Sequence, residues 1–368
     1  MPRLRNLHMT LRYQDDLRLF RSRYARAAVL ALLVGGVLFP LSFKSEFWLS
    51  VLDYAGIAAI GAIGLNLLTG YTGQVSLGHA FFIGVGAYCA VFFGGHHHVN
   101  LLIWLGAAAV IGGLIGGLVG PFALRLRGSY LAIVSLGLVF LGLHVFRNWT
   151  QLTGGPGGTS VAPPLKLGPL DFTKLQIGNQ VYSRNQSFFL LIWAIVGLTA
   201  LVSKNIVRSR PGRAMQAIRD RDVAAEVVGV RLARYKIGAF VVSSALAAVA
   251  GALFGAYQQF VQPDNWSLFV SIQYIAIIIV GGIGSIYGSV LGALFVGAVP
   301  QLVDRYSKSI PFVAKTAVGS SGFHLSVFQL NQIIFGALIV LFLVLEPRGL
   351  AAVWQRLKTY LRAWPFSY

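Results

Sequence analysis

Long apolar stretches separated by short polar ones constrain the fold of this chain more than any other feature. They recur from Ala27 to Leu345, and several approach the roughly 20 residues that an α-helix needs to cross a bilayer. Only 11% of the 368 residues are charged, far below the share of about a quarter in soluble domains. Backbone polar groups inside a bilayer must pair within the spanning structure, which favours helices. The sequence therefore predicts an all-α polytopic membrane protein.

The apolar stretches divide into about ten expected transmembrane helices, with about eight as the alternative if a marginal pair does not cross. The second, third, eighth and ninth contain several glycines, so we expect some of them to be broken or re-entrant. The expected spans cover residues 27–43, 49–69, 77–94, 101–124, 129–147, 187–203, 237–258, 268–282, 286–303 and 327–345.

The distribution of Lys and Arg predicts that both termini are cytoplasmic. With the N-terminus inside, 22 of the 30 basic residues fall on the cytoplasmic side, as the positive-inside rule requires. The same rule explains the net charge of +19 without nucleic acid. We therefore expect a basic cytoplasmic arm (1–26), one transmembrane domain (27–345) and a cytoplasmic tail (346–368).

Two loops of the transmembrane domain stand out. The outer loop 147–186 is rich in Gly and Pro, and it suits a docking surface or gate about as well as a plain connector. The cytoplasmic loop 204–236 carries nine Lys/Arg and three Asp/Glu. Pro211 suits a first helical turn and Gly229 a helix end, and apolar residues recur three and four apart between them. We interpret the loop as a basic amphipathic helical segment that is long enough to be held by another protein.

Small residues at every fourth position predict close contacts between helices, because they let backbones approach in lipid. These contacts could join helices of this chain or reach a second membrane subunit. The helix-packing candidates are Gly112, Gly116, Gly120, Gly284, Gly288 and Gly292.

The glycine-rich segment 70–88, GYTGQVSLGHAFFIGVGAY, places polar groups at the edge of a span or inside it. Non-helical backbone at membrane depth is tolerated only where protein or a water-filled cavity covers it. We regard these groups as lining a solute path, with a polar contact between helices as the alternative. The path candidates, including two glutamines at the outer end of the seventh span, are Tyr71, Gln74, Ser76, His79, Gln258 and Gln259.

Other functional classes find less support in the residues. All acidic residues map to loops or span ends, whereas ion-driven carriers usually hold an ionisable group in the membrane. A phosphate-binding G-x-x-x-x-G-K-[ST] loop is absent from the sequence. Ser76 and His79 have neither an acid nearby nor a G-x-S-x-G motif, so we predict no catalytic residues. The triplet His96–His98 suits a solvated loop better than a metal site, since adjacent side chains converge poorly on one ion.

Several stretches taken together resemble the membrane permease subunits of branched-chain amino acid ABC importers, of the LivM-like kind. They follow the family order through most of the chain. The matching stretches are GYTGQVSLGHAFFIGVGAY at 70–88, RLRGSYLAIVSLG at 125–137, LTGG at 152–155, SRPGRAMQAIRDRDVAAEVVGV at 209–230, VGGIGSIYGSVLGA at 280–293 and EPRGL at 346–350.

This resemblance implies a translocation path for branched-chain amino acids or related small solutes, with urea, amides and aromatic acids also occurring in the family. It implies a second, related permease subunit, two cytoplasmic ATPase subunits and a periplasmic solute-binding protein in a bacterial inner membrane. The chain itself would bind no cofactor, because ATP and Mg would be held by the ATPases. The alternative function is a stand-alone ion-coupled secondary transporter.

The resemblance also implies that the cytoplasmic loop couples the permease to the ATPases. ABC importers often carry E-A-A-x-x-x-G there, and Ala224, Ala225 and Gly229 match it while Val223 replaces the Glu. The expected coupling residues are Arg213, Ala217, Arg219, Asp220, Asp222, Ala224, Ala225, Glu226 and Gly229.

Overall fold

A computed structural model describes residues 35–36, 39–40, 45–125, 129–168, 170–173, 175–177, 180–306, 313–314, 325–346 and 348–363. Contacts divide the chain into two units, residues 1–44 and 45–368. The basic arm 1–26 and nearly all of the first expected span lie outside the described residues. The second unit contains the nine other expected spans.

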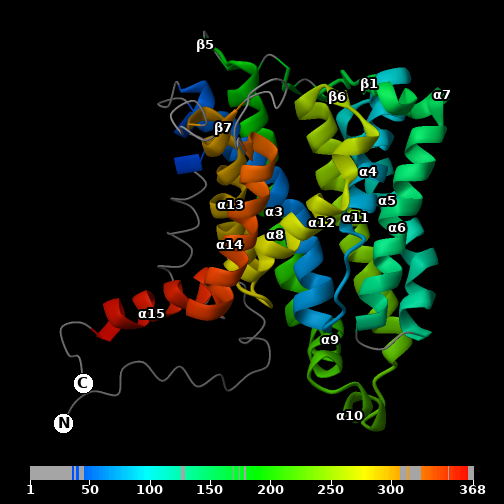
Figure 1. Cartoon of the computed structure of the whole chain (residues 1–368), viewed down its shortest axis with the longest axis vertical. Coiled ribbons are helices and arrows are strands. Elements are labelled where there is room, and N and C mark those ends of the chain that lie inside the picture. The colour runs from blue at the N-terminus through cyan, green and yellow to red at the C-terminus, as the bar shows by residue number, and fades with distance from the viewer. Residues whose placement is uncertain are drawn as a thin grey trace. The chain divides into compact units, whose positions relative to one another are not determined.

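Each of these nine expected spans is a helix in the structure (Figure 1), which confirms an all-α polytopic protein. Within the described ranges, seven helices are long and apolar enough to cross a membrane. An eighth span is reached if α14 and α15, bent by 45° at their junction, count as one. The nine helices are α3 (Glu46–Thr72), α4 (His79–Cys89), α5 (Leu101–Arg125), α6 (Ser129–Asn148), α8 (Arg184–Arg208), α11 (Leu232–Gln258), α12 (Leu268–Gly281), α13 (Ile286–Tyr306) and α14 (Val327–Leu345).

Glycines interrupt these helices in fewer places than the sequence suggests. Helix α3 runs unbroken for 27 residues and ends at Gly73, whose left-handed φ of 71° suits glycine. Helix α4 passes into a π-helix, η1 (Ala90–His96), and α12 is only 14 residues long. Helix α13 continues through Pro300. The helices of the second and ninth expected spans are therefore continuous. Their glycines leave room for neighbouring helices to pack closely and do not end the helix.

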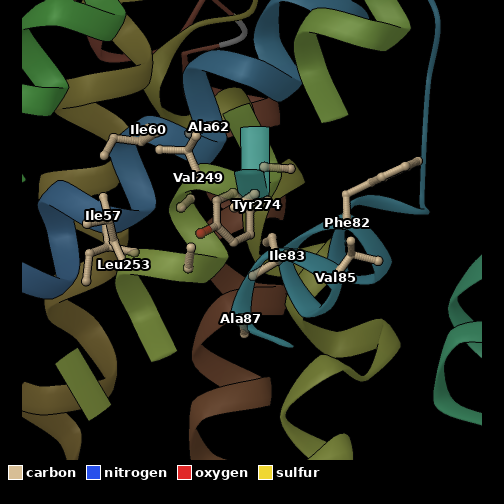
Figure 2. Close-up of a cluster of buried hydrophobic side chains, with 14 of the residues drawn as sticks. Ile57, Ile60, Ala62, Phe82, Ile83, Val85, Ala87, Val249, Leu253 and Tyr274 are labelled. Atoms are coloured by element: carbon tan, nitrogen blue, oxygen red, sulfur yellow. The ribbon is translucent and has the colours of Figure 1, made fainter. Parts of the chain in front are cut away.

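The core of this unit lies where α3, α4, α11 and α12 pack together. Figure 2 shows Tyr274 of α12 among apolar side chains of α3, α4 and α11, such as Ile57, Ile83 and Leu253. Glycines bring the backbones close here, since a Cβ on Gly86 or Gly251 would overlap the backbone of the facing helix. Shape matching of this kind holds helices together in lipid, where apolar burial alone contributes little.

Short elements join the helices at the two ends of the bundle (Figure 1). One end carries the helix α7 (Thr150–Thr153) and the antiparallel pair β1 (Thr159–Ser160) and β6 (Phe260–Val261). The other end carries α9 (Arg210–Asp220), α10 (Asp222–Val227) and α15 (Gly349–Ala363). The remaining short elements are η2 (Gly155–Gly157), β2 (Lys166–Leu167), β3 (Leu170–Asp171), β4 (Gln176–Ile177), β5 (Gln180–Val181), η3 (Pro263–Trp266), β7 (Val313–Ala314) and β8 (Leu325–Ser326).

Candidate functional site

A non-helical connection, residues 73–78, runs back into the bundle between α3 and α4. Helix α4 begins with His79, whose ring lies 4.9 Å from that of Tyr274. The same tyrosine ring faces Gly61, near the middle of α3. The chain therefore leaves the end of α3 and returns to its middle before the next helix starts.

Serine side chains from two other helices accept hydrogen bonds from this connection and from the first turn of α4. The Leu77 amide donates to Ser135 Oγ of α6 at 2.8 Å. The Ala80 amide donates to Ser271 Oγ of α12 at 2.9 Å. Neither serine stood out in the sequence. They show how irregular backbone can lie deep among apolar helices, since protein groups take the place of water.

The solute-path candidates fall into two separate groups. Gln74, Ser76 and His79 are buried along the non-helical connection, where Gln74 Nε2 donates to the Lys236 carbonyl at 3.4 Å. Within the described ranges His79 Nε2 has no hydrogen-bond partner. Tyr71 is buried near the end of α3.

The two glutamines lie at the opposite end of the bundle. Gln258 closes α11 and accepts a hydrogen bond from the Tyr54 hydroxyl. Gln259 caps α11 with a left-handed φ of 60°. The structure thus brings the first three candidates together and leaves the glutamines apart from them.

The basic amphipathic loop 204–236 contains two helices, α9 and α10. Helix α9 buries Gly212, Met215 and Ile218, so one face is packed against the bundle. Arg219 Nη1 donates to the Gly70 carbonyl of α3 at 3.0 Å. A cation is favourable at the carboxyl end of a helix, where carbonyl groups lack partners. Asp220 pairs with the same guanidinium at 3.2 Å.

Helix α10 and the residue after it expose apolar side chains on the surface. Asp222 starts it and pairs with Lys236 Nζ at 2.6 Å. Three valines project from it or from its end with side chains largely in the open: Val223 is 70%, Val227 82% and Val228 77% exposed. The sequence drew attention to Val223 only where it replaces the Glu of E-A-A-x-x-x-G. Val223 and Val227 are one helical turn apart, so they project from the same side of α10.

The remaining coupling candidates divide between the two faces. Ala225 is buried and Ala217 half-buried, while Arg213, Ala224, Glu226 and Gly229 are exposed. Gly229 has a φ of 86°, which a side chain would strain. It ends the α10 turn before α11 begins.

Both rows of packing glycines contact other segments of this chain. Gly112 and Gly116 of α5 meet Ala248 and Ser244 of α11, and Gly120 meets Ile237. Gly288 and Gly292 of α13 meet Gly281 and Ile277 of α12. Gly284 lies in the α12–α13 connection against Gly70 and Arg219.

The histidine triplet lies at the end of η1. His96 closes the π-helix, and His97 and His98 are exposed. The described part of the chain contains no group of three His, Cys, Asp or Glu residues arranged to hold a metal ion.

One acidic residue departs from the expected pattern. Asp53 lies about two helical turns inside α3 and is fully buried. Sequence reasoning placed it at a span end, but α3 starts earlier, at Glu46.

Comparison with known families decides the kind of protein. Residues 47–343 match the family described as "Branched-chain amino acid transport system / permease component". The chain belongs to this family. This match confirms the resemblance to permease subunits that the sequence segments between residues 70 and 350 indicated.

The permease has curated relatives of two kinds. It is 30% identical over 337 residues to the high-affinity branched-chain amino acid transport system permease protein LivM of Salmonella typhimurium, covering 88% of this chain and 74% of the relative. The Escherichia coli LivM protein matches with the same identity and coverage. The Escherichia coli protein LivH is 26% identical, covering 79% of this chain and 90% of LivH. No solved structure matches the permease.

Proposed function

We propose that this permease forms the translocation path of an ATP-driven importer for branched-chain amino acids or related small solutes. The names of the LivM relatives support the solute class. The likeness to both LivM and LivH supports pairing with a second, related permease. Two ATPase subunits, holding ATP and Mg, and a periplasmic solute-binding protein would complete the complex in a bacterial inner membrane.

The observation that carries the coupling role is the two-sided arrangement of α9 and α10. Helix α9 buries one face against the bundle and holds the end of α3 through Arg219. Helix α10 presents Val223, Val227 and Val228 to the outside. An exposed apolar cluster on a charged loop suits seating in a groove of another protein. A movement of α10 caused by the partner protein would then be transmitted through α9 to α3.

The proposed orientation places both termini, α9 and α10 in the cytoplasm, with about ten spans or about eight. The non-helical connection 73–78, with Gln74, Ser76 and His79, would line the solute path. Broken helices at membrane depth commonly form such sites in transporters.

The first test is gentle detergent purification of the tagged permease from its own membranes, followed by mass spectrometry. We expect a second permease and two ATPases in stoichiometric amounts. A permease that comes out alone, even after crosslinking, would overturn the importer proposal.

The second test uses the purified complex in proteoliposomes with its binding protein. Leucine uptake should require ATP. Replacing residues 209–230 by a flexible linker of equal length should abolish uptake while the spans remain folded. Uptake that survives this replacement would contradict the coupling role.

A further inference from the structure

Asp53 of α3 is a fully buried acidic residue that has no role in the function proposed above. Its exposed fraction is 0%. Neither carboxylate oxygen has a hydrogen-bond partner in the ranges that the structure describes. Burying a carboxylate without a partner costs far more than burying a paired one. A cationic or hydrogen-bond-donating group that binds Asp53 from outside the chain would offset this cost.

The direction of Asp53 follows from its neighbours on α3. Tyr54 reaches α11, where its hydroxyl donates to Gln258. Gly56 faces α8, because a Cβ there would meet Ile192 and lie 3.5 Å from Trp193 Nε1. Successive residues of an α-helix are turned by about 100°, so Asp53 points between these two directions. It therefore faces the junction of α3, α8 and α11.

Tyr257 and Arg184 are further polar groups at this junction. Tyr257 of α11 lies within electrostatic range of Asp53 and of Arg184. Its ring packs edge-on against Phe188 of α8, with centroids 5.4 Å apart. Arg184 Nη2 donates to the carbonyl oxygens of Ala256 at 3.0 Å and Tyr257 at 3.1 Å. Asp53 of α3 and Arg184 of α8 thus both lie near Tyr257.

A second unpaired group belongs to the same junction. Trp193 Nε1 of α8 is buried and has no acceptor among the described residues. It lies beside Gly56, one helical turn beyond Asp53 on α3. The junction therefore has an unpaired acceptor on α3 and an unpaired donor on α8.

We propose that Asp53 binds the ammonium group of a zwitterionic amino acid during its passage through the permease. The ammonium group would donate to the Asp53 carboxylate, and Trp193 Nε1 of α8 would donate to the solute carboxylate. The proposal rests on the proposed function, since it assumes that the cargo is an amino acid. It adds a binding residue that the polar segment 70–88 does not contain.

The test uses Asp53→Asn in the complete complex in proteoliposomes, with leucine as the probe. Leucine uptake and ATP hydrolysis are measured in the same vesicles. Uptake should fall at least tenfold, equivalent to about 1.4 kcal/mol. Hydrolysis stimulated by leucine-loaded binding protein should stay within about twofold of wild type, so the ATP consumed per leucine rises.

Two variants serve as controls. Asp53→Glu keeps the charge and should retain more uptake than Asp53→Asn. Glu46→Gln removes an exposed carboxylate at the start of the same helix and should leave both rates unchanged. Wild-type uptake by Asp53→Asn would overturn the proposal. An effect of Asp53→Asn that appears only as a changed pH dependence of uptake would also overturn it, because Asp53 would then hold a proton.

A measurement on the wild-type complex covers the case in which Asp53→Asn fails to assemble. A hydrophobic carbodiimide modifies buried carboxyl groups, and mass spectrometry quantifies its addition at Asp53. Labelling during turnover should fall when leucine-loaded binding protein is present. Labelling that leucine does not change would overturn the inference. Failure of the proposed function itself looks different, since the wild-type complex would then show no ATP-driven leucine uptake.

Discussion

The guanidinium group of Arg219 lies at the carboxyl end of α3, with Nη1 3.0 Å from the carbonyl oxygen of Gly70. The contact joins residues 149 positions apart in the sequence. Glycine is required at Gly70, because a Cβ there would overlap Asn66 and the backbone of Gly284. One side chain of the amphipathic loop thus connects α9, the end of α3 and the α12–α13 connection.

Arg219→Ala should reduce transport by the assembled complex. The change removes a hydrogen bond from a charged donor, a contact worth about 1.5–3 kcal/mol, and with it the link between α9 and α3. We expect leucine uptake in proteoliposomes to fall at least tenfold while the complex still assembles. Lys358→Ala, which removes an exposed cation from α15, is the matched control. Equal uptake by both variants would contradict the proposed path of motion.

Val227→Asp should prevent the ATPases from binding. Val227 is 82% exposed, so a charge there costs the isolated permease little. In an interface the same charge would be desolvated without a partner. Co-purification of the ATPases is the measurement. Val227→Ile keeps the apolar surface and should co-purify normally. ATPase recovery that is the same for the Asp and Ile variants would show that α10 is not the contact.

Gly251→Ala should destabilise the packing of α4 on α11. A Cβ at Gly251 would overlap the backbone of Ile83, and overpacking of this kind costs about 1–3 kcal/mol. The measurement is unfolding in a titration with sodium dodecyl sulfate, followed by tryptophan fluorescence. Gly238→Ala in the same helix meets no atom within 4 Å. It should be neutral or stabilising by up to about 1 kcal/mol.

Asn66→Ala should loosen the contact between α3 and α13. The Asn66 amide donates to Ser289 Oγ at 2.7 Å and accepts from the Gly284 amide at 2.8 Å. Removing it leaves buried groups unpaired, at a cost of about 1–3 kcal/mol. The same unfolding titration measures the effect. Asn205→Ala, at an exposed position of α8, should change the midpoint much less. An equal shift in both variants would contradict the structural role of Asn66.

Much of the architecture followed from local patterns. Each expected span from 49–69 onward is a helix, because apolar residues and span length are properties of contiguous sequence. Pro211 lies in the first turn of α9, and Gly229 follows the end of α10. The candidate site was harder to predict. The connection 73–78 was recognised by its glycines and polar groups. Ser135 and Ser271, which accept hydrogen bonds from Leu77 and Ala80, come from helices far along the chain.

The sequence by itself determined that the chain is a helical membrane permease with a basic amphipathic loop, since hydropathy, charge and family motifs are carried by neighbouring residues. Only the tertiary structure decided which face of that loop is buried and which exposes the valines. It alone placed Asp53 at the junction of three helices without a partner among the described residues. Burial and pairing depend on helices that approach from distant parts of the chain, and no local pattern records those approaches.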